Sequence, residues 1–300
     1  MKVLLLGFVA SLGASLAPVL TRPLYTEGLN AFQGLVLISF FGALSLSLLA
    51  FHPEFFKSPK SVLRRWKSLL FIGLVFQAAP ACLLHYGLMS LPAMFVVMLK
   101  RLQPILILLI VFLIQRKSVS LISVVASVVS VAGVCLLIVS GEGFGLQGVE
   151  ENWTALLSVM LAVLLWALFF VFVKQVGEGI SPEWINFFIL LCLIVVNLPL
   201  SFVLNPWPEG IFQNHQLMLL TLINGAFCFA FGLTAVNYCL KLLDPVVMSL
   251  LMLLGPLVAA AGAHFLLNET LNQIQISGLL TSLVGLSLLP AEKLFKKRSN

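Results

Sequence analysis

The chain alternates long apolar runs with short polar breaks. Ten runs follow one another, at Val3–Thr21, Phe32–Phe51, Ser68–Leu88, Pro92–Ile114, Val119–Val139, Trp153–Val173, Trp184–Leu204, Leu217–Leu240, Val246–Leu267 and Ile274–Leu289. Most approach the ~20 residues that a helix needs to cross the hydrocarbon core of a bilayer. With 61% hydrophobic and 9% charged residues, the chain cannot bury its apolar surface in one water-soluble core. We therefore predict an all-α integral membrane protein with ten transmembrane helices.

The basic residues gather on one side of the predicted membrane. Ten crossings place both termini on one side, where fourteen of the 17 Lys and Arg residues fall, and only Arg22 falls on the other side. Because cytoplasmic loops are enriched in Lys and Arg, we expect cytoplasmic termini, in a bacterial inner membrane. The tail KLFKKRSN is then a topology signal and a contact for membrane lipid, and nucleic acid is not an expected partner.

The second half of the chain repeats features of the first. An offset of 152 residues places Tyr86 on Tyr238, Pro104 on Pro256, Ser130 on Ser282 and Gly133 on Gly285. We predict two five-helix domains, 1–149 and 150–300. Because five is an odd number, the second copy enters the membrane from the opposite face, as in the inverted repeats typical of secondary transporters. The first run has the positive start of a secretory signal, but the repeat requires it as a helix.

Motifs in the second half resemble a transporter family. LLWALFFVFVKQVGEGISP, from Leu164, and AVNYCLKLLDP, from Ala235, are similar to the start-of-domain and helix 3–4 patterns of EamA-type domains in the drug/metabolite transporter superfamily. The first half departs from this pattern, with Ala14 where the tryptophan would stand. The resemblance implies a ten-helix secondary carrier and does not name its substrate.

Two adjacent cations, Lys100 and Arg101, interrupt the apolar run Pro92–Ile114. At 1.5 Å per residue, Lys100 lies ~12 Å below the start of the run, near the middle of a ~30 Å core. An unpaired cation there costs ~2.5–3.5 kcal/mol, and none of the 11 acidic residues lies inside a predicted run. We expect the pair to bind the anionic group of a substrate, with structural pairing or snorkelling as the alternative. Pro104 should loosen the helix on the face of Lys100.

The segment MLKRLQP also resembles a narrower branch, the triose-phosphate and nucleotide-sugar translocators. In that branch a lysine, or Lys-Arg, in the corresponding helices binds phosphate. The offset partners Met252 and Leu253 are apolar, so only one half supplies charge and a carboxylate zwitterion fits equally well. The expected substrates are phosphorylated or nucleotide-like metabolites, amino acids and S-adenosylmethionine.

Other polar and aromatic residues in the runs are candidates for the same site: Gln77, Tyr86, Trp166, Asn224 and Tyr238. Each has a structural alternative, because amides bond neighbouring helices and aromatic side chains anchor at the membrane interface. His85 and His264 are candidates for carrying protons.

The predicted function is secondary transport of a small anionic or zwitterionic metabolite by alternating access, through exchange or facilitated movement. An exporter of amino acids or apolar metabolites, in which Lys100 and Arg101 are structural, is the first alternative. A membrane-embedded enzyme is the second, although the chain has no HExxH, no DxxD and no close carboxylate pair within a run. It also has no GxxxxGK[ST] motif and no metal spacing among its cysteines, so we expect no cofactor or metal.

Overall fold

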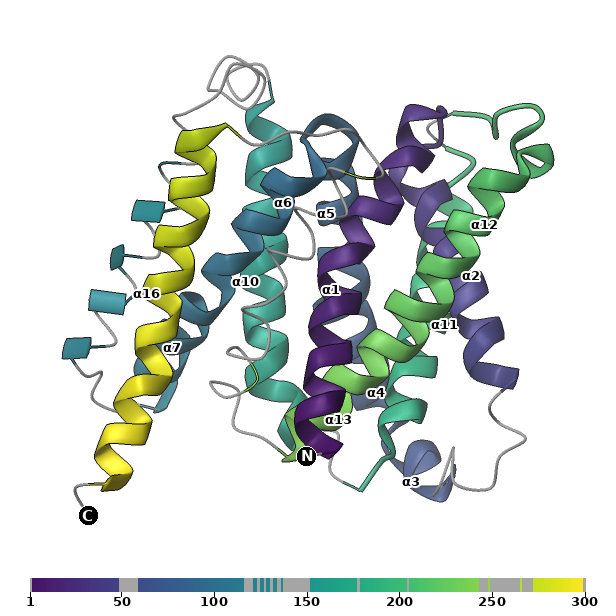
Figure 1. The fold of residues 1–300 in the computed structure, drawn as a ribbon. Helices are drawn as coiled ribbons and strands as arrows, with labels where there is room; N and C mark the ends of the chain where they lie inside the picture. Colours follow the sequence, from purple (N-terminus) through teal and green to yellow (C-terminus); the bar gives the residue numbers. More distant parts are fainter. Residues whose placement is uncertain are drawn as a thin grey trace.

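The computed structural model describes residues 2–48, 59–115, 152–176, 179–203, 205–242 and 272–298, together with residues 121, 122, 125, 126, 128, 129, 132, 133, 136, 248 and 265. Within these residues the chain is helical and contains no strand. The helices stand side by side, and α1 begins at the same end of the bundle at which α16 ends (Figure 1).

The first half contains two long helices and two helices that change their winding. They are α1 (Lys2–Thr26), α2 (Ala31–Leu48), α3 (Pro59–Arg64), α4 (Trp66–Gly73), the π-helix η2 (Leu74–Ala78), α5 (Ala79–Ser90), α6 (Ala93–Leu99), the 3-10 turn η3 (Lys100–Leu102) and α7 (Gln103–Gln115). The segments α4, η2 and α5 form one continuous helical stretch, as do α6, η3 and α7.

The described elements of the second half include two long helices and one further helix that changes its winding. It contains α10 (Trp153–Val176), α11 (Pro182–Leu200), the 3-10 turn η4 (Ile211–Gln213), α12 (His215–Ile223), the π-helix η5 (Asn224–Gly232), α13 (Leu233–Leu242) and α16 (Gln273–Arg298). Eight of the ten predicted runs coincide with helices, although α1 and α16 continue beyond their apolar runs. The ninth run and most of the fifth lie outside the described residues.

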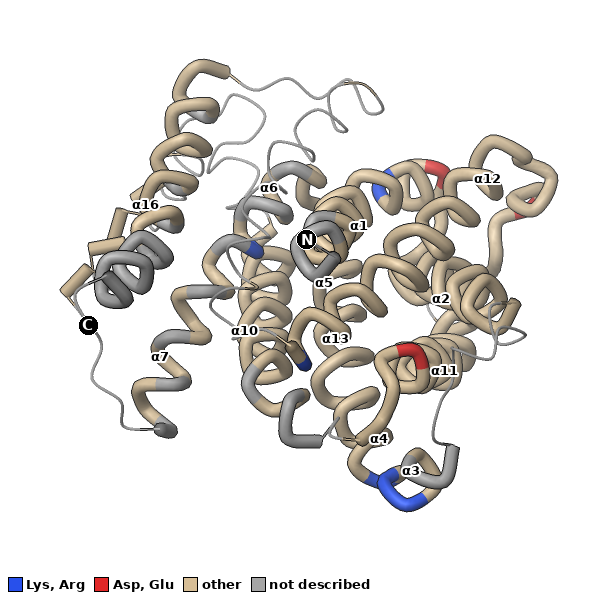
Figure 2. Tube along the Cα trace, turned by 60° about the horizontal axis from the view of Figure 1, so that its bottom comes forward, with Lys and Arg blue, Asp and Glu red and all other residues tan. Residues whose placement is uncertain are grey.

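Several helices meet the requirements of a membrane span. In the part of the chain that the structure describes, five stretches are long and apolar enough to cross a bilayer: Ala31–Leu48, Trp66–Ser90, Trp153–Phe170, Pro182–Leu200 and His215–Leu242. Charged residues are sparse along the bundle, and basic residues stand out at α3, at its edge (Figure 2).

Polar side chains define where helices begin. At the start of α2, the Asn30 amide donates to Gln33 Oε1 and the Gln33 amide donates to Asn30 Oδ1, both at 2.9 Å. This reciprocal pair satisfies two of the N–H groups that a helix start leaves without partners. Ser181 does the same for α11 by accepting from the Trp184 amide at 3.4 Å, with Pro182 at the first helical position.

Arg22 stabilises the end of another helix. Leu88 lies in the last turn of α5, where carbonyl groups have no partner within the helix. The Arg22 guanidinium donates to the Leu88 carbonyl through Nη1 and so joins α1 to α5. Arg22 therefore holds two helices together, in addition to being counted in the predicted distribution of basic residues across the membrane.

The helices of the two halves pack in a reciprocal pattern. Helix α1 packs on η5 and α13, and α10 packs on η2 and α5. In the same way, α2 packs on η5, and α11 packs on η2 and α4. Adding 152 to the residue numbers brings α1 onto α10, α2 onto α11, and η2 inside η5. The contacts of α10 and α11 with the first half therefore correspond to those of α1 and α2 with the second half.

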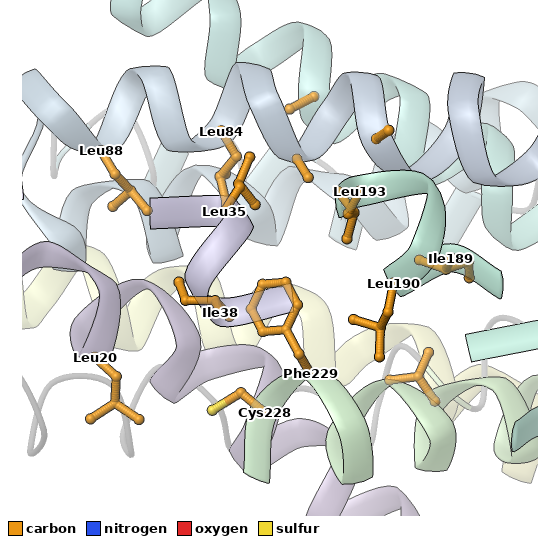
Figure 3. Close-up of a cluster of buried hydrophobic side chains, with 14 of the residues drawn as sticks. Leu20, Leu35, Ile38, Leu84, Leu88, Ile189, Leu190, Leu193, Cys228 and Phe229 are labelled. Carbon is orange, nitrogen blue, oxygen red and sulfur yellow. The ribbon is translucent and has the colours of Figure 1, made fainter. Parts of the chain in front are cut away.

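A shared apolar core joins the halves. Figure 3 shows part of this core, with labelled side chains from α1, α2, α5, α11 and η5: Leu20, Leu35, Ile38, Leu84, Leu88, Ile189, Leu190, Leu193, Cys228 and Phe229. Helix η5 approaches α2 closely at Gly225, where a Cβ atom would lie 2.6 Å from the Ile38 carbonyl oxygen. The two helices can therefore pack this closely only without a side chain at that position.

Candidate functional site

The helix that carries Lys100 changes its winding at that residue. Because Pro104 has no N–H group, the Lys100 carbonyl cannot accept the usual bond from the fourth residue along the chain. The Gln103 amide donates to that carbonyl instead, which produces the 3-10 turn η3 between α6 and α7. The helix is thus interrupted where Pro104 predicted it, but by a tighter 3-10 turn and not by a loosened one.

The Lys100 ammonium contacts residues from both halves of the chain. Its Nζ donates to the Ala14 carbonyl at 3.1 Å and lies 5.1 Å from the centroid of the Trp166 ring, within cation–π range. The Trp166 indole in turn donates from Nε1 to Gln77 Oε1 at 3.3 Å. We call Ala14, Gln77, Lys100 and Trp166 the Lys100 cluster.

In the Lys100 cluster, one charged side chain lies near a glutamine amide and a tryptophan indole. Gln77 is buried, whereas Lys100 and Trp166 are partly exposed. In apolar surroundings the attraction between an ammonium and an anion is much stronger than in water. The arrangement is therefore suited to binding a small anion beside an aromatic face.

The structure brings together three of the predicted site residues and separates others from them. Lys100, Gln77 and Trp166 meet in the Lys100 cluster. Tyr86 on α5 and Tyr238 on α13 are 47% and 39% exposed. Any contact of these tyrosines with substrate stays a prediction.

Asn224 forms a helix-to-helix contact. It is fully buried at the start of η5, and its Nδ2 donates to Thr21 Oγ1 at 2.8 Å and to the Ala17 carbonyl at 3.4 Å. These bonds connect η5 to α1. Bonding to a neighbouring helix is the alternative to substrate binding that the sequence left open for this amide. Its role in substrate binding is untested.

Of the candidates His85, His264 and Arg101, the structure describes the side chain of His85 alone. His85 is buried on α5, and its Nδ1 is hydrogen-bonded to the Tyr25 hydroxyl. All of His264 and the side chain of Arg101 lie outside the described part of the structure, while the Arg101 backbone belongs to η3.

Sequence reasoning missed Tyr25 and Asn186. Tyr25 lies beyond the apolar run that predicted the first helix, and only the fold places it against His85. Asn186 Nδ2 donates to the Phe229 and Ala230 carbonyls, at 2.8 and 2.9 Å, so it binds the π-helix η5 to α11. A single amide within an apolar run was the available signal for Asn186, as it was for Asn224.

Replacing Tyr25 by phenylalanine should destabilise the protein. The change leaves the buried His85 Nδ1 without the hydroxyl partner, and a buried polar group without its hydrogen bond costs ~1–3 kcal/mol. Tyr86→Phe is the matched control, because Tyr86 is adjacent to His85 in sequence and half exposed. Thermal unfolding should show a lower Tm for Tyr25→Phe alone. Equal Tm values for both variants and the parent would contradict a stabilising Tyr25–His85 pair.

The apolar helices and the similarity to known proteins together define a multi-pass integral membrane protein. The chain matches the EamA-like transporter family over residues 1–139 and again over residues 153–290, and it belongs to that family. It is therefore a transmembrane transporter of the drug/metabolite transporter type. Membership points to a small-molecule transporter rather than an enzyme.

Two further similarities are more distant. Protein PecM from Dickeya dadantii (strain 3937) is 27% identical over 223 residues, which cover 72% of this chain and 71% of PecM. One solved chain, described as a crystal structure of a protein, superposes with a TM-score of 0.72 over 98% of both chains. Because the sequence identity is 16%, that likeness concerns the fold alone.

Proposed function

We propose that this transporter is a secondary carrier for a small anionic or zwitterionic metabolite, and that the Lys100 ammonium binds the anionic group. The position of Lys100 carries the proposal. It is a partly exposed cation on an interrupted turn of an apolar helix, beside the Ala14 carbonyl and the Trp166 ring. A charge at this depth is costly in lipid, and such residues commonly mark substrate pathways.

The contacts of Lys100 support a site between the two halves. Ala14 and Trp166 are equivalent positions under the offset of 152 residues, and Lys100 contacts both of them. A side chain that contacts both equivalent positions lies close to the axis that relates the halves. Transporters built from inverted repeats bind substrate at this boundary, near the middle of the membrane.

Three observations support two inverted five-helix repeats over residues 1–149 and 150–300. The family matches the chain twice, with starting residues 152 apart. Under the same offset η2 falls inside η5, and the end of α5 falls on the end of α13. The reciprocal packing of α1 with α10 and of α2 with α11 across the halves follows the same relation. Rocking of one repeat against the other would then provide alternating access.

The chemistry of the Lys100 cluster fits more than one anion. A lysine ammonium is a compact charge that binds phosphate or carboxylate without a fixed planar geometry. Phosphorylated or nucleotide-like metabolites, amino acids and S-adenosylmethionine therefore remain the proposed cargo. We propose exchange or facilitated movement as the mode of transport, with Arg101 as a further contact for the anion.

The arrangement of the chain ends supports cytoplasmic termini in an inner membrane. The start of α1, the end of α16 and the basic segment α3 lie at the same end of the bundle (Figure 1). Basic residues favour the cytoplasmic side of a membrane.

A second candidate function is export of neutral or apolar cargo, with Lys100 as a structural residue. The bond to the Ala14 carbonyl and the position over the Trp166 ring favour it, because these contacts stabilise the ammonium without a substrate. The two candidates differ in which compounds should stabilise the folded protein.

A ligand panel on the detergent-purified protein tests the proposal. The panel contains sugar phosphates, nucleotides, amino acids and adenosyl-sulfonium compounds, with neutral amphiphiles and salt of equal ionic strength as controls. A ligand at 100 times its Kd stabilises a folded protein by ~2.7 kcal/mol, and we expect one anionic or zwitterionic class to raise Tm in this way. Stabilisation by neutral amphiphiles alone would favour the second candidate.

A further inference from the structure

The outer face of α4 is apolar from its first turn. Trp66 and Phe71 are 48% and 55% exposed, and Leu74, the first residue of η2, is 39% exposed, whereas Leu69 and Ile72 on the opposite face are buried. In a membrane protein such a face lies against acyl chains. Leu63, at the end of α3, is 74% exposed and continues the apolar surface below Trp66.

Basic side chains surround the lower end of this face. Arg64 and Lys67 are exposed and Arg65 is partly exposed, all within one turn of Trp66. The Lys67 ammonium lies 5.8 Å from the centroid of the Trp66 ring. The segment lies at the outer edge of the bundle, where the tube is blue at α3 (Figure 2). We call residues 63–67 the α3–α4 corner.

We propose that the α3–α4 corner binds an anionic phospholipid. The lipid phosphate contacts Arg64, Arg65 and Lys67, and an acyl chain follows the exposed face of α4 along Trp66 and Phe71. Arginine binds phosphate through paired hydrogen bonds, and basic residues next to a membrane attract anionic headgroups. Tryptophan prefers the boundary between headgroups and acyl chains.

The apolar part of the corner is what selects a lipid over a free anion. Inorganic phosphate could satisfy the cations, but it makes no contact with the apolar side chains of Leu63 and Trp66. An amphiphile with a negative headgroup matches both parts of the surface.

The test measures thermal unfolding of delipidated protein in neutral detergent, with added phosphatidylglycerol or phosphatidylcholine. We expect phosphatidylglycerol to raise Tm by ~3 °C or more over phosphatidylcholine, the effect of ~1 kcal/mol in a protein domain. The combined variant R64Q, R65Q and K67Q should lose this difference. The control K2Q, K174Q and K241Q removes three positive charges from α1, α10 and α13, away from the corner, and should keep it.

Three results would overturn the proposal: equal stabilisation by both lipids, persistence of the difference in the corner variant, or its loss in the control variant alone. A rise in Tm with inorganic phosphate equal to that with phosphatidylglycerol would identify a phosphate site instead of a lipid site. If the combined variant is less stable than the parent in phosphatidylcholine, R64Q alone is compared, since that side chain is exposed. Trp66→Ala should weaken the lipid effect without removing it.

Discussion

Replacing Lys100 by alanine should weaken binding of the stabilising anion by ~10–100-fold while the protein stays folded. The ammonium supplies a charge-assisted hydrogen bond, worth ~1.5–3 kcal/mol, and each 1.4 kcal/mol is tenfold in Kd. Because Lys100 is partly exposed, its removal leaves a smaller defect than the loss of a fully buried side chain. Calorimetric titration of the anion found in the ligand panel measures the change.

Lys67→Ala is the matched control for Lys100→Ala. Lys67 also lies against a tryptophan ring, at 5.8 Å compared with 5.1 Å for Lys100, but it is exposed on α4. Its removal should leave the Kd for the anion unchanged in neutral detergent. Lys100→Arg keeps the charge and should retain part of the affinity. An unchanged Kd in folded Lys100→Ala would show that the ammonium is structural.

Gly225→Ala should lower the free energy of unfolding by ~3 kcal/mol, at the upper end of the range for overpacked cores. The added Cβ would lie 2.6 Å from the Ile38 carbonyl oxygen and 2.8 Å from the Gly42 amide nitrogen. Both are backbone atoms, so η5 and α2 must move apart to admit the methyl group. Thermal unfolding, or loss of monodisperse protein on purification, measures the effect.

Gly73 is the corresponding glycine in the first half, and it provides the comparison. A Cβ there would lie 2.6 Å from Sγ of Cys192, which is a side-chain atom. Gly73→Ala should therefore be partly rescued by Cys192→Ala, whereas Gly225→Ala has no side chain whose removal relieves the contact. Wild-type stability of Gly225→Ala would contradict the close packing of η5 on α2.

The apolar runs predicted most of the helices because membrane insertion imposes a length and a composition on each span. Two adjacent cations in an apolar run were also visible in the sequence. Pro104 indicated where the helix would be interrupted, but not that the interruption would be a tighter 3-10 turn. Gln77 and Trp166 were identified as polar or aromatic residues within runs, without any indication that they would meet.

The contacts between helices were not predictable from one sequence. Which face of α1 presents Ala14 to Lys100 depends on packing among several helices, as does the pairing of Tyr25 with His85. The π-helices η2 and η5 also left no clear sequence signal, because their extra width is stabilised by contacts such as that of Asn186 with η5. For an apolar helix, hydrophobicity does not distinguish the face that meets lipid from the face that meets protein.

Counterflow in proteoliposomes tests the central claim most directly. Vesicles loaded with the stabilising anion are placed in a trace of the same anion carrying a radioactive label, with no ATP present. The account predicts rapid uptake of label by the parent and by Lys67→Ala, and none above background by Lys100→Ala. Uptake by Lys100→Ala at the rate of the parent would contradict binding of the transported anion at Lys100.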